Sequence, residues 1–186
     1  DAEEGEFVTP QDKVATIYRG IAEKVDDPML ARQYWTRLAE IQEKLGRIED
    51  AADSYEKVLA LDPTDKEALE AMDALYRRTE HWVELVSVYR RRIELEHGGG
   101  EAETLYAEMA QAYEEKLGRP EEAIAAYREV LTIDPASRVA LTALDGLFTR
   151  QQDWPELAEN LETQLTLVET DQAEVDLMLR LAALRE

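Results

Sequence analysis

The sequence predicts an all-α protein in which antiparallel helix pairs stack side by side as an α-solenoid of about ten helices. The first observation is an internal repeat, because residues 43–63 return closely matched as residues 115–135, 72 positions later. The second is a set of helix stop signals between apolar runs of helical spacing. The third is that no segment alternates apolar and polar residues for long enough to form a strand.

Proline and glycine mark the ends of the predicted helices. The segments Leu61–Pro63 and Ile133–Pro135 each end one helix and precede another, because proline cannot continue a helix interior. Leu45–Arg47 and Leu117–Arg119 each contain a glycine suited to a left-handed helix end. The helices predicted in chain order cover residues 10–25, 29–45, 48–61, 65–79, 82–96, 101–117, 120–133, 136–151, 154–168 and 172–185.

Several side chains inside these helices carry expectations of their own. Asp53 and Ser54 fall within a predicted helix and are expected to face solvent. Trp82 returns as Trp154 at the 72-residue offset, so we expect both, with Trp35, to be core or half-buried structural residues.

The order of residues within each half of the 72-residue unit resembles the tetratricopeptide repeat (TPR) family. In that family an aromatic, a large aliphatic, a small residue and a second aromatic occupy fixed slots of the first helix, and alanine, an aromatic and a final proline follow. Gln42 and one extra residue before Gly118 are the departures. The slots hold Trp35, Leu38, Ala39, Gln42, Ala51, Tyr55 and Pro63 in the first full repeat, and Tyr106, Met109, Ala110, Tyr113, Ala123, Tyr127 and Pro135 in the third.

The second and fourth repeats keep the spacing but change the residues. Leu69 and Leu141 replace the first aromatic, and Asp73 and Asp145 stand where a small residue is usual. The resemblance implies a right-handed superhelix whose first helices line the inner surface. It divides the chain, as one solenoid domain, into an acidic, disordered lead (1–8), the second helix of a partial repeat (9–27), four repeats (29–63, 64–97, 101–135 and 136–169) and the first helix of a further partial repeat (171–186). Because the chain starts and stops inside repeats, we expect a fragment of a longer, bacterial-type TPR protein.

The charge of the chain narrows the choice of partners. The 186 residues include 42 acids and 21 Lys plus Arg, for a net charge of −21. Such a field repels nucleic acid and anionic membrane surfaces, and no apolar run reaches the roughly 18 residues of a spanning helix. An RNA-binding helical repeat would need a basic inner face, which the sequence does not offer. The compartment is not fixed by these features, although the cytoplasm is slightly favoured.

Chemistry is not indicated by any motif. The absence of cysteine excludes disulfides and thiolate metal sites. The glycines after His97 lack the lysine of a phosphate-binding loop, so we interpret them as a helix end and a linker. Asp26, Asp27, Asp62 and Asp65 are interpreted as helix caps, which need an acceptor near free N–H groups. The sequence therefore predicts a protein that is not an enzyme and holds no cofactor or metal.

The predicted function is a protein–protein interaction scaffold that binds a basic or amphipathic segment of a partner in a concave, acid-rich groove. Repeats offer such a surface on the first helix of each pair. The alternative is a self-assembling module, because apolar residues at uncapped ends, such as Val14, Ile17, Leu181 and Leu184, could stack between copies. The candidate groove residues are Arg37, Glu40, Glu70, Ala74, Arg77, Arg78, Glu108, Gln111, Thr142, Gly146 and Arg150.

Overall fold

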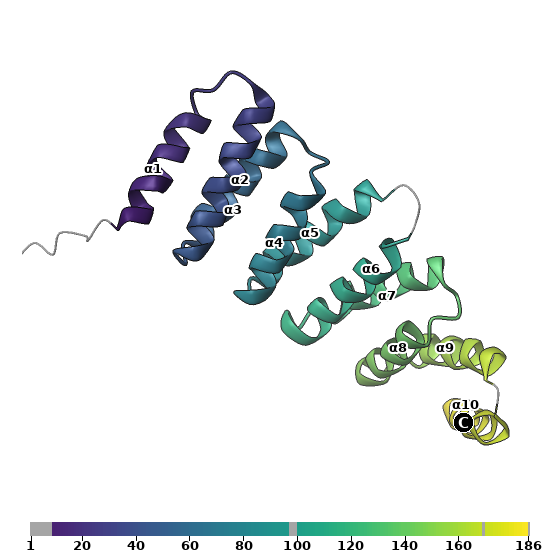
Figure 1. The fold of residues 1–186 in the computed structure, drawn as a ribbon. Coiled ribbons are helices and arrows are strands. Elements are labelled where there is room, and N and C mark those ends of the chain that lie inside the picture. The colour runs from purple at the N-terminus through teal and green to yellow at the C-terminus, as the bar shows by residue number, and fades with distance from the viewer. Residues whose placement is uncertain (1–8, 97–99, 169, 186) are drawn as a thin grey trace, which may run out of the picture. The chain divides into compact units, whose positions relative to one another are not determined.

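The computed structural model describes residues 9–96, 100–168 and 170–185, and throughout these ranges the regular structure is helical (Figure 1). The all-α prediction with about ten helices is therefore confirmed. The predicted lead at residues 1–8 lies outside the described residues. The elements are α1 (Pro10–Ala22), α2 (Pro28–Lys44), α3 (Ile48–Leu61), α4 (Lys66–Arg78), α5 (Trp82–Leu95), α6 (Ala102–Gln111), the π-helical turn η1 (Ala112–Lys116), α7 (Pro120–Ile133), α8 (Arg138–Gln151), α9 (Trp154–Leu167) and α10 (Asp171–Leu184).

The helices fall into two compact units, Asp1–Val88 and Tyr89–Glu186, which we call unit 1 and unit 2. In unit 1, α1 packs against α2, α2 against α3 and α3 against α4. In unit 2, α6 packs against α7, α7 against α8, α8 against α9 and α9 against α10. Within each unit these helices thus pack on their neighbours in sequence, as expected for stacked helical hairpins.

Helix ends are fixed by the residues that the sequence indicated. Asp27 accepts a hydrogen bond from the backbone N–H of Met29 at 2.9 Å, and Asp65 accepts one from Ala68 at 3.0 Å. These carboxylates satisfy N–H groups that the first turn of a helix leaves free. Gly46 and Gly118 have φ of +73° and +61°, the left-handed conformation that ends α2 and follows η1.

The core of each unit is built on the slots of the repeat pattern. Ala39 and Ala51 are fully buried where α2 meets α3, and Ala110 and Ala123 are fully buried at the matching place in unit 2. Small side chains at these positions let two helices approach closely. The large buried side chains around them include Leu38, Tyr55, Val58, Leu59, Leu69, Met72 and Leu75 in unit 1, and Met109, Tyr127, Val130, Leu141, Leu144, Leu147 and Leu161 in unit 2.

Ser54 does not face solvent, which corrects the expectation from the sequence. It is buried beside Gln42, whose side chain is also buried in the slot of the second aromatic. In the amide orientation that satisfies both ends, Gln42 Nε2 lies 2.6 Å from Ser54 Oγ and Gln42 Oε1 lies 3.2 Å from Arg19 Nη2. Ser54 is therefore hydrogen-bonded to Gln42 of the neighbouring helix α2 and not to water.

The tryptophans are less buried than a core role requires. Trp35 and Trp82 are half-buried, as expected. Trp154 is 45% exposed, so the expectation is wrong for this residue. It occupies the first position of α9.

The extra residue of the third repeat is absorbed by η1. An α-helix that gains one residue without shifting its two ends forms a π-turn, and η1 occupies residues 112–116 directly before the turn at Gly118. Glu43 and Glu114 are 71 positions apart, whereas Lys44 and Lys116 are 72 apart. The inserted residue is therefore Glu115, in the middle of the π-turn.

Candidate partner-binding site

A polar groove of about 630 Å³ lies in unit 1, between the first helices α2 and α4 and the flanking α1 and α3. Its wall contains hydroxyls, two arginines, three carboxylates and two small residues from α4. This mixture offers hydrogen-bond donors, acceptors and ring faces to an extended chain. The lining residues are Tyr18, Arg32, Gln33, Tyr34, Thr36, Arg37, Glu40, Tyr55, Asp65, Glu67, Ala68 and Ala71.

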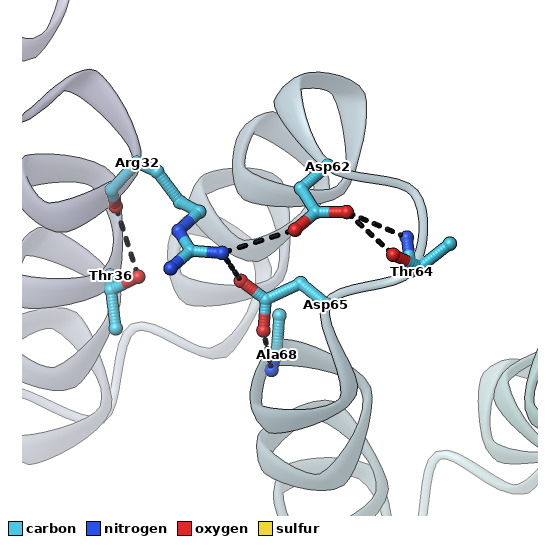
Figure 2. A network of polar contacts seen from close by, with 6 residues as sticks. All are labelled: Arg32, Thr36, Asp62, Thr64, Asp65 and Ala68. Carbon is cyan, nitrogen blue, oxygen red and sulfur yellow. Dashed lines mark hydrogen bonds and ion pairs between the residues drawn. The ribbon is translucent and has the colours of Figure 1, made fainter. Parts of the chain in front are cut away.

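Arg32 joins the wall of the groove to the turn between α3 and α4 (Figure 2). Its Nη1 lies 3.1 Å from Asp62 Oδ2 and 3.2 Å from Asp65 Oδ2. Asp62 also accepts hydrogen bonds from Thr64 N at 3.1 Å and Thr64 Oγ1 at 2.8 Å. The hydrogen bonds from Thr64, with the nearby Arg32 charge, lower the pKa of Asp62. Two carboxylates thus share one guanidinium, and the cluster keeps an excess of negative charge.

Tyrosine rings and a second ion pair form the other part of the groove. The Tyr18 and Tyr34 ring centroids are 5.9 Å apart with the planes tilted by 54°, a favourable aromatic arrangement. Arg37 Nη1 donates to Glu40 Oε2 at 2.8 Å on the same helix. Both groove arginines therefore have carboxylate partners within the protein, whereas Glu67 forms no ion pair with any other described residue.

In both units a glutamate is bonded to a tyrosine and an arginine from the next two helices, an arrangement that we call the tyrosine–glutamate–arginine clamp. In unit 1, Tyr55 Oη donates to Glu43 Oε1 at 2.7 Å and Arg78 Nη2 donates to Glu43 Oε2 at 2.9 Å. Burial, followed by the hydrogen bond to Glu43, raises the pKa of Tyr55 far above its usual range. The clamp ties three successive helices, α2, α3 and α4, through one carboxylate.

The clamp of unit 2 uses residues at the matching positions. Tyr127 Oη donates to Glu114 Oε2 at 3.5 Å, and Arg150 donates to Glu114 Oε1. Burial, with the Glu114 charge next, raises the pKa of Tyr127 to about 12. The sequence did not identify either glutamate, although the spacing Glu43–Tyr55 and Glu114–Tyr127 was a usable signal.

The unit 1 residues predicted for the groove separate into three groups. Arg37 and Glu40 line it. Arg78 is held by Glu43, and Arg77 donates to Asp73 on its own helix at 3.2 Å. Glu70 and Ala74 are exposed on α4 but are not lining residues of the groove.

The unit 2 residues predicted for the groove are also divided. Thr142 lines an apolar pocket of about 420 Å³ between α8, α9 and α10. Arg150 is engaged by Glu114. On α6, Gln111 is exposed and Glu108 is half-buried. At Gly146 a Cβ would meet open space. Whether any of these eleven residues contacts a partner stays a prediction.

Ten of the twelve lining residues of the unit 1 groove are not among the eleven candidate residues. Arg32 lies one turn before Thr36, and this spacing places both on the same helix face. Tyr18 of α1, Tyr55 of α3 and Asp65 before α4 are brought to the groove only by the packing of the helices. The ten residues are Tyr18, Arg32, Gln33, Tyr34, Thr36, Tyr55, Asp65, Glu67, Ala68 and Ala71.

Across the described ranges, no group of three or more His, Asp or Glu side chains is placed to hold a metal ion. Within the same ranges, the helices are too short or too polar to span a bilayer.

Models of the tetratricopeptide repeat match residues 33–65, 68–103 and 103–137. No curated protein sequence matches the chain. The crystal structure of MamA is 17% identical, covers 87% of this chain and 96% of its own, and superposes with a TM-score of 0.50, which shows a shared fold. YrrB, a TPR protein with an unusual peptide-binding site, is 15% identical with a TM-score of 0.48, over 91% of this chain and 82% of its own.

Proposed function

The chain belongs to the tetratricopeptide repeat family, and from that premise we propose that it is a non-catalytic scaffold that binds a basic segment of a partner protein in the unit 1 groove. Stacked helical repeats create extended surfaces for protein partners. The observation that carries the proposal is the groove itself, in which tyrosine rings and acids are accessible beside arginines that already have partners.

The charges of the groove favour a basic occupant over an acidic one. Its lining includes Glu40, Asp65 and Glu67 against Arg32 and Arg37, and Asp62 adds a further acid through its contact with Arg32. An incoming carboxylate would compete with Glu40 or Asp65 for its arginine. An incoming lysine or arginine meets Glu67, and its aliphatic stem can lie over a tyrosine ring.

Short labelled peptides test this proposal by fluorescence anisotropy. We expect a peptide of alternating lysine and phenylalanine to bind, and a matched peptide with glutamate in place of lysine not to bind. Glu67→Arg should weaken binding about tenfold, equivalent to about 1.4 kcal/mol. Glu129→Arg, the same change at an exposed position of α7, is the matched control. Equal binding of both peptides, or a Glu67→Arg variant that binds like the control, would reject the groove as the site.

The exposed residues of α4 provide a second arm of the experiment. Glu70 is one helical turn from Glu67 but lies outside the lining of the groove. Loss of binding in Glu70→Arg with normal binding in Glu67→Arg would move the site to the outward surface of α4. For an amphipathic partner segment we propose a different location, the unit 2 pocket, because its wall contains Leu141, Leu167 and Leu177.

Self-assembly is the second candidate function. The observation that favours it is a stripe of exposed apolar residues on α1 and another on α10. It makes no use of the unit 1 groove, so the two functions can be tested separately.

A further inference from the structure

A groove of about 400 Å³, which we call the α7–α9 groove, lies in unit 2 between α7 and α9, with α8 beneath them. Its floor is formed by Leu141, Leu144 and Phe148 of α8, which are between 2% and 4% exposed. Helices α6 and α10 pack on α7 and α9, so the groove lies inside the stack of unit 2 and not at an end of it. Small-molecule sites in proteins have volumes of roughly 300–1,000 Å³. The lining residues are Arg128, Leu131, Leu141, Leu144, Phe148, Glu156, Glu159, Asn160 and Thr163.

Asn160 brings a buried polar side chain to the wall of this groove. The residue is only 6% exposed, and its Nδ2 donates to the backbone carbonyl of Leu141 at 2.9 Å. Its side-chain oxygen, Oδ1, has no hydrogen-bond partner among the described residues. Buried acceptors are nearly always hydrogen-bonded, because a missing partner costs free energy. The Asn160 Oδ1 is therefore available to a donor that enters the groove.

The repeat framework does not require a polar residue at this position. Val88 stands 72 residues before Asn160 and is 1% exposed. Leu59 stands 72 residues before Leu131 and is 2% exposed, whereas Leu131 itself is half-buried. The matching positions of the first 72-residue unit are thus apolar and buried, and the amide and the opening beside it belong to the α7–α9 groove.

Two further side chains of α9 offer acceptors in the same groove. Glu159 and Thr163 line it together with Asn160. Glu159 is exposed, and its carboxylate forms no ion pair with any other described residue. The Thr163 hydroxyl donates to the Glu159 backbone carbonyl at 3.0 Å, which leaves the lone pairs of Oγ1 able to accept. Three acceptors on one side of α9 are therefore open to a ligand with N–H groups.

The charge of the groove favours a cation. Arg128 is the single cation among the nine described residues that line it, against the carboxylates of Glu156 and Glu159. Its Nη2 lies 2.5 Å from Glu156 Oε2, and its guanidinium lies over the Phe148 ring, 5.8 Å from the centroid. One carboxylate is thus neutralised within the protein, and the charge of Glu159 remains.

We propose that the α7–α9 groove binds a primary ammonium group carried on an apolar stem, the chemistry shared by a lysine side chain and a small organic amine. An ammonium has three N–H donors, which match the acceptors of Asn160, Glu159 and Thr163. The stem lies against Leu131, the half-buried apolar wall of the groove. The site shares no residue with the unit 1 groove, so either can fail without the other.

NMR titration of the isotope-labelled 1–186 chain with phenethylammonium, up to about 10 mM because so small a ligand binds weakly, tests the site. We expect the side-chain amide of Asn160 and the backbone amides of α9 to shift. Phenethyl alcohol has the same ring without the charge and should bind about tenfold more weakly, because charge-assisted hydrogen bonds are the stronger ones. Phenylacetate should not bind. An absence of shifts with phenethylammonium, or tighter binding of phenylacetate through Arg128, would overturn the proposal.

Variants of α9 locate the bound ammonium. Asn160→Val introduces the residue that α5 has as Val88, so the variant should fold, and it should weaken binding about tenfold through loss of a hydrogen bond to a charged group. Glu159→Gln, at an exposed position, should weaken binding several-fold, and it serves if circular dichroism shows that the valine variant is unfolded. Glu129→Gln, the same change at an exposed position of α7, is the matched control. Binding that survives the α9 changes, or that falls equally in the control, would overturn the site.

A short peptide with one lysine between leucines distinguishes the two sources of the ammonium. Displacement of phenethylammonium by this peptide, and not by its acetyl-lysine form, assigns the groove to a lysine of a partner protein. If neither peptide displaces phenethylammonium, the ligand is a free amine. Equal displacement by the acetylated form would show that the apolar stem alone directs binding and would overturn the role of the ammonium. Glu67→Arg should leave all of these results unchanged, which separates them from binding in the unit 1 groove.

Discussion

The first repeat, in unit 1, and the third repeat, in unit 2, fill the same framework with different residues. The small residues at the helix crossing and the clamped tyrosine are the same in both, as Ala39, Ala51 and Tyr55 in one and Ala110, Ala123 and Tyr127 in the other. The slot of the second aromatic differs. Gln42 is bonded to Ser54 in unit 1, whereas unit 2 has the buried Tyr113 and Ala126 at the matching positions.

In both units the polar group of the side chain in this slot has a hydrogen-bond partner. The Gln42 amide is bonded to Ser54 across the helix pair and to Arg19 from α1. In unit 2 the Tyr113 ring is buried, and Arg90 donates to its hydroxyl at 2.6 Å. Arg19 and Arg90 occupy matching positions, so an arginine reaches the tip of the side chain in both units. The framework thus requires a matched pair of side chains, and the size of either member alone is less restricted.

The largest expected effect tests whether the shared framework is equivalent in the two units. Tyr55→Ala and Tyr127→Ala should each lower the free energy of unfolding by about 3–5 kcal/mol, since both rings are buried. Urea denaturation followed by circular dichroism measures the loss. The phenylalanine variants isolate the hydroxyl, and Tyr55→Phe should lose about 1 kcal/mol, more than Tyr127→Phe, whose hydrogen bond is longer. A difference of more than about 2 kcal/mol between the alanine variants, beyond the usual context dependence, would show that the two units do not share one framework.

The next effect tests the matched pair directly. Tyr113→Gln should destabilise the protein by about 3 kcal/mol, because it removes a buried ring and leaves an amide facing Ala126. Adding Ala126→Ser gives the amide the partner that Gln42 has and should return about 1 kcal/mol. The serine change alone should be destabilising, since it buries a hydroxyl against a ring. Additive losses in the double variant, read from the double-mutant cycle, would contradict the idea of a matched pair.

The helices were predictable because their signals are local. Prolines and glycines fixed both ends of α3 and α7 at the predicted residues, since these residues restrict the backbone wherever they occur. The binding surface was less predictable, because Tyr18 of α1 and Asp65 before α4 reach the same groove only through packing. Ser54 was placed wrongly for the same reason, since its partner lies on another helix.

The role of the charged residues was also hidden from the sequence. Arg78 and Arg150 were predicted to face a partner, and the structure shows them bound to Glu43 and Glu114. A sequence with 42 acids offers each arginine many possible partners, so spacing alone does not select one. The repeat of the clamp at matching positions is a signal that a comparison of the two halves could have found.

A smaller effect concerns the aspartates of the second and fourth repeats. Asp73 pairs with Arg77 on its own helix, whereas Asp145 pairs with Arg180 of α10. Burial acts to raise the pKa of Asp145, but the hydrogen bonds from Arg180 outweigh it, so the net pKa is lowered. A lowered pKa in the folded state gives stability that is present above the unfolded value of 3.8 and is lost as the pH falls through the folded value.

Asp145→Asn should therefore destabilise unit 2 by about 1 kcal/mol at pH 7, a modest value because Arg180 is partly exposed to solvent. The difference from the wild type should shrink as the pH falls below 3.8 and disappear only below the lowered pKa of the folded state. Urea denaturation of dilute samples at pH 7, 5 and 3 measures it. A deficit that persists unchanged at pH 3 would mean that packing, and not the carboxylate charge, holds α10.

The smallest effect belongs to the π-turn. Deletion of Glu115 makes the third repeat as long as the first, and the exposed side chain leaves no cavity. The π-turn should relax to an α-helix with Glu114 still beside Tyr127, so the free energy of unfolding should change by less than about 1 kcal/mol. Deletion of Lys44, at the matching place in α2, removes a residue from a helix that has no π-turn. It should be destabilising by several times more, because it rotates Gln42 and Glu43 away from their partners on α3. Equal losses for the two deletions would show that η1 is an integral part of the unit 2 packing and that the extra residue is not merely accommodated.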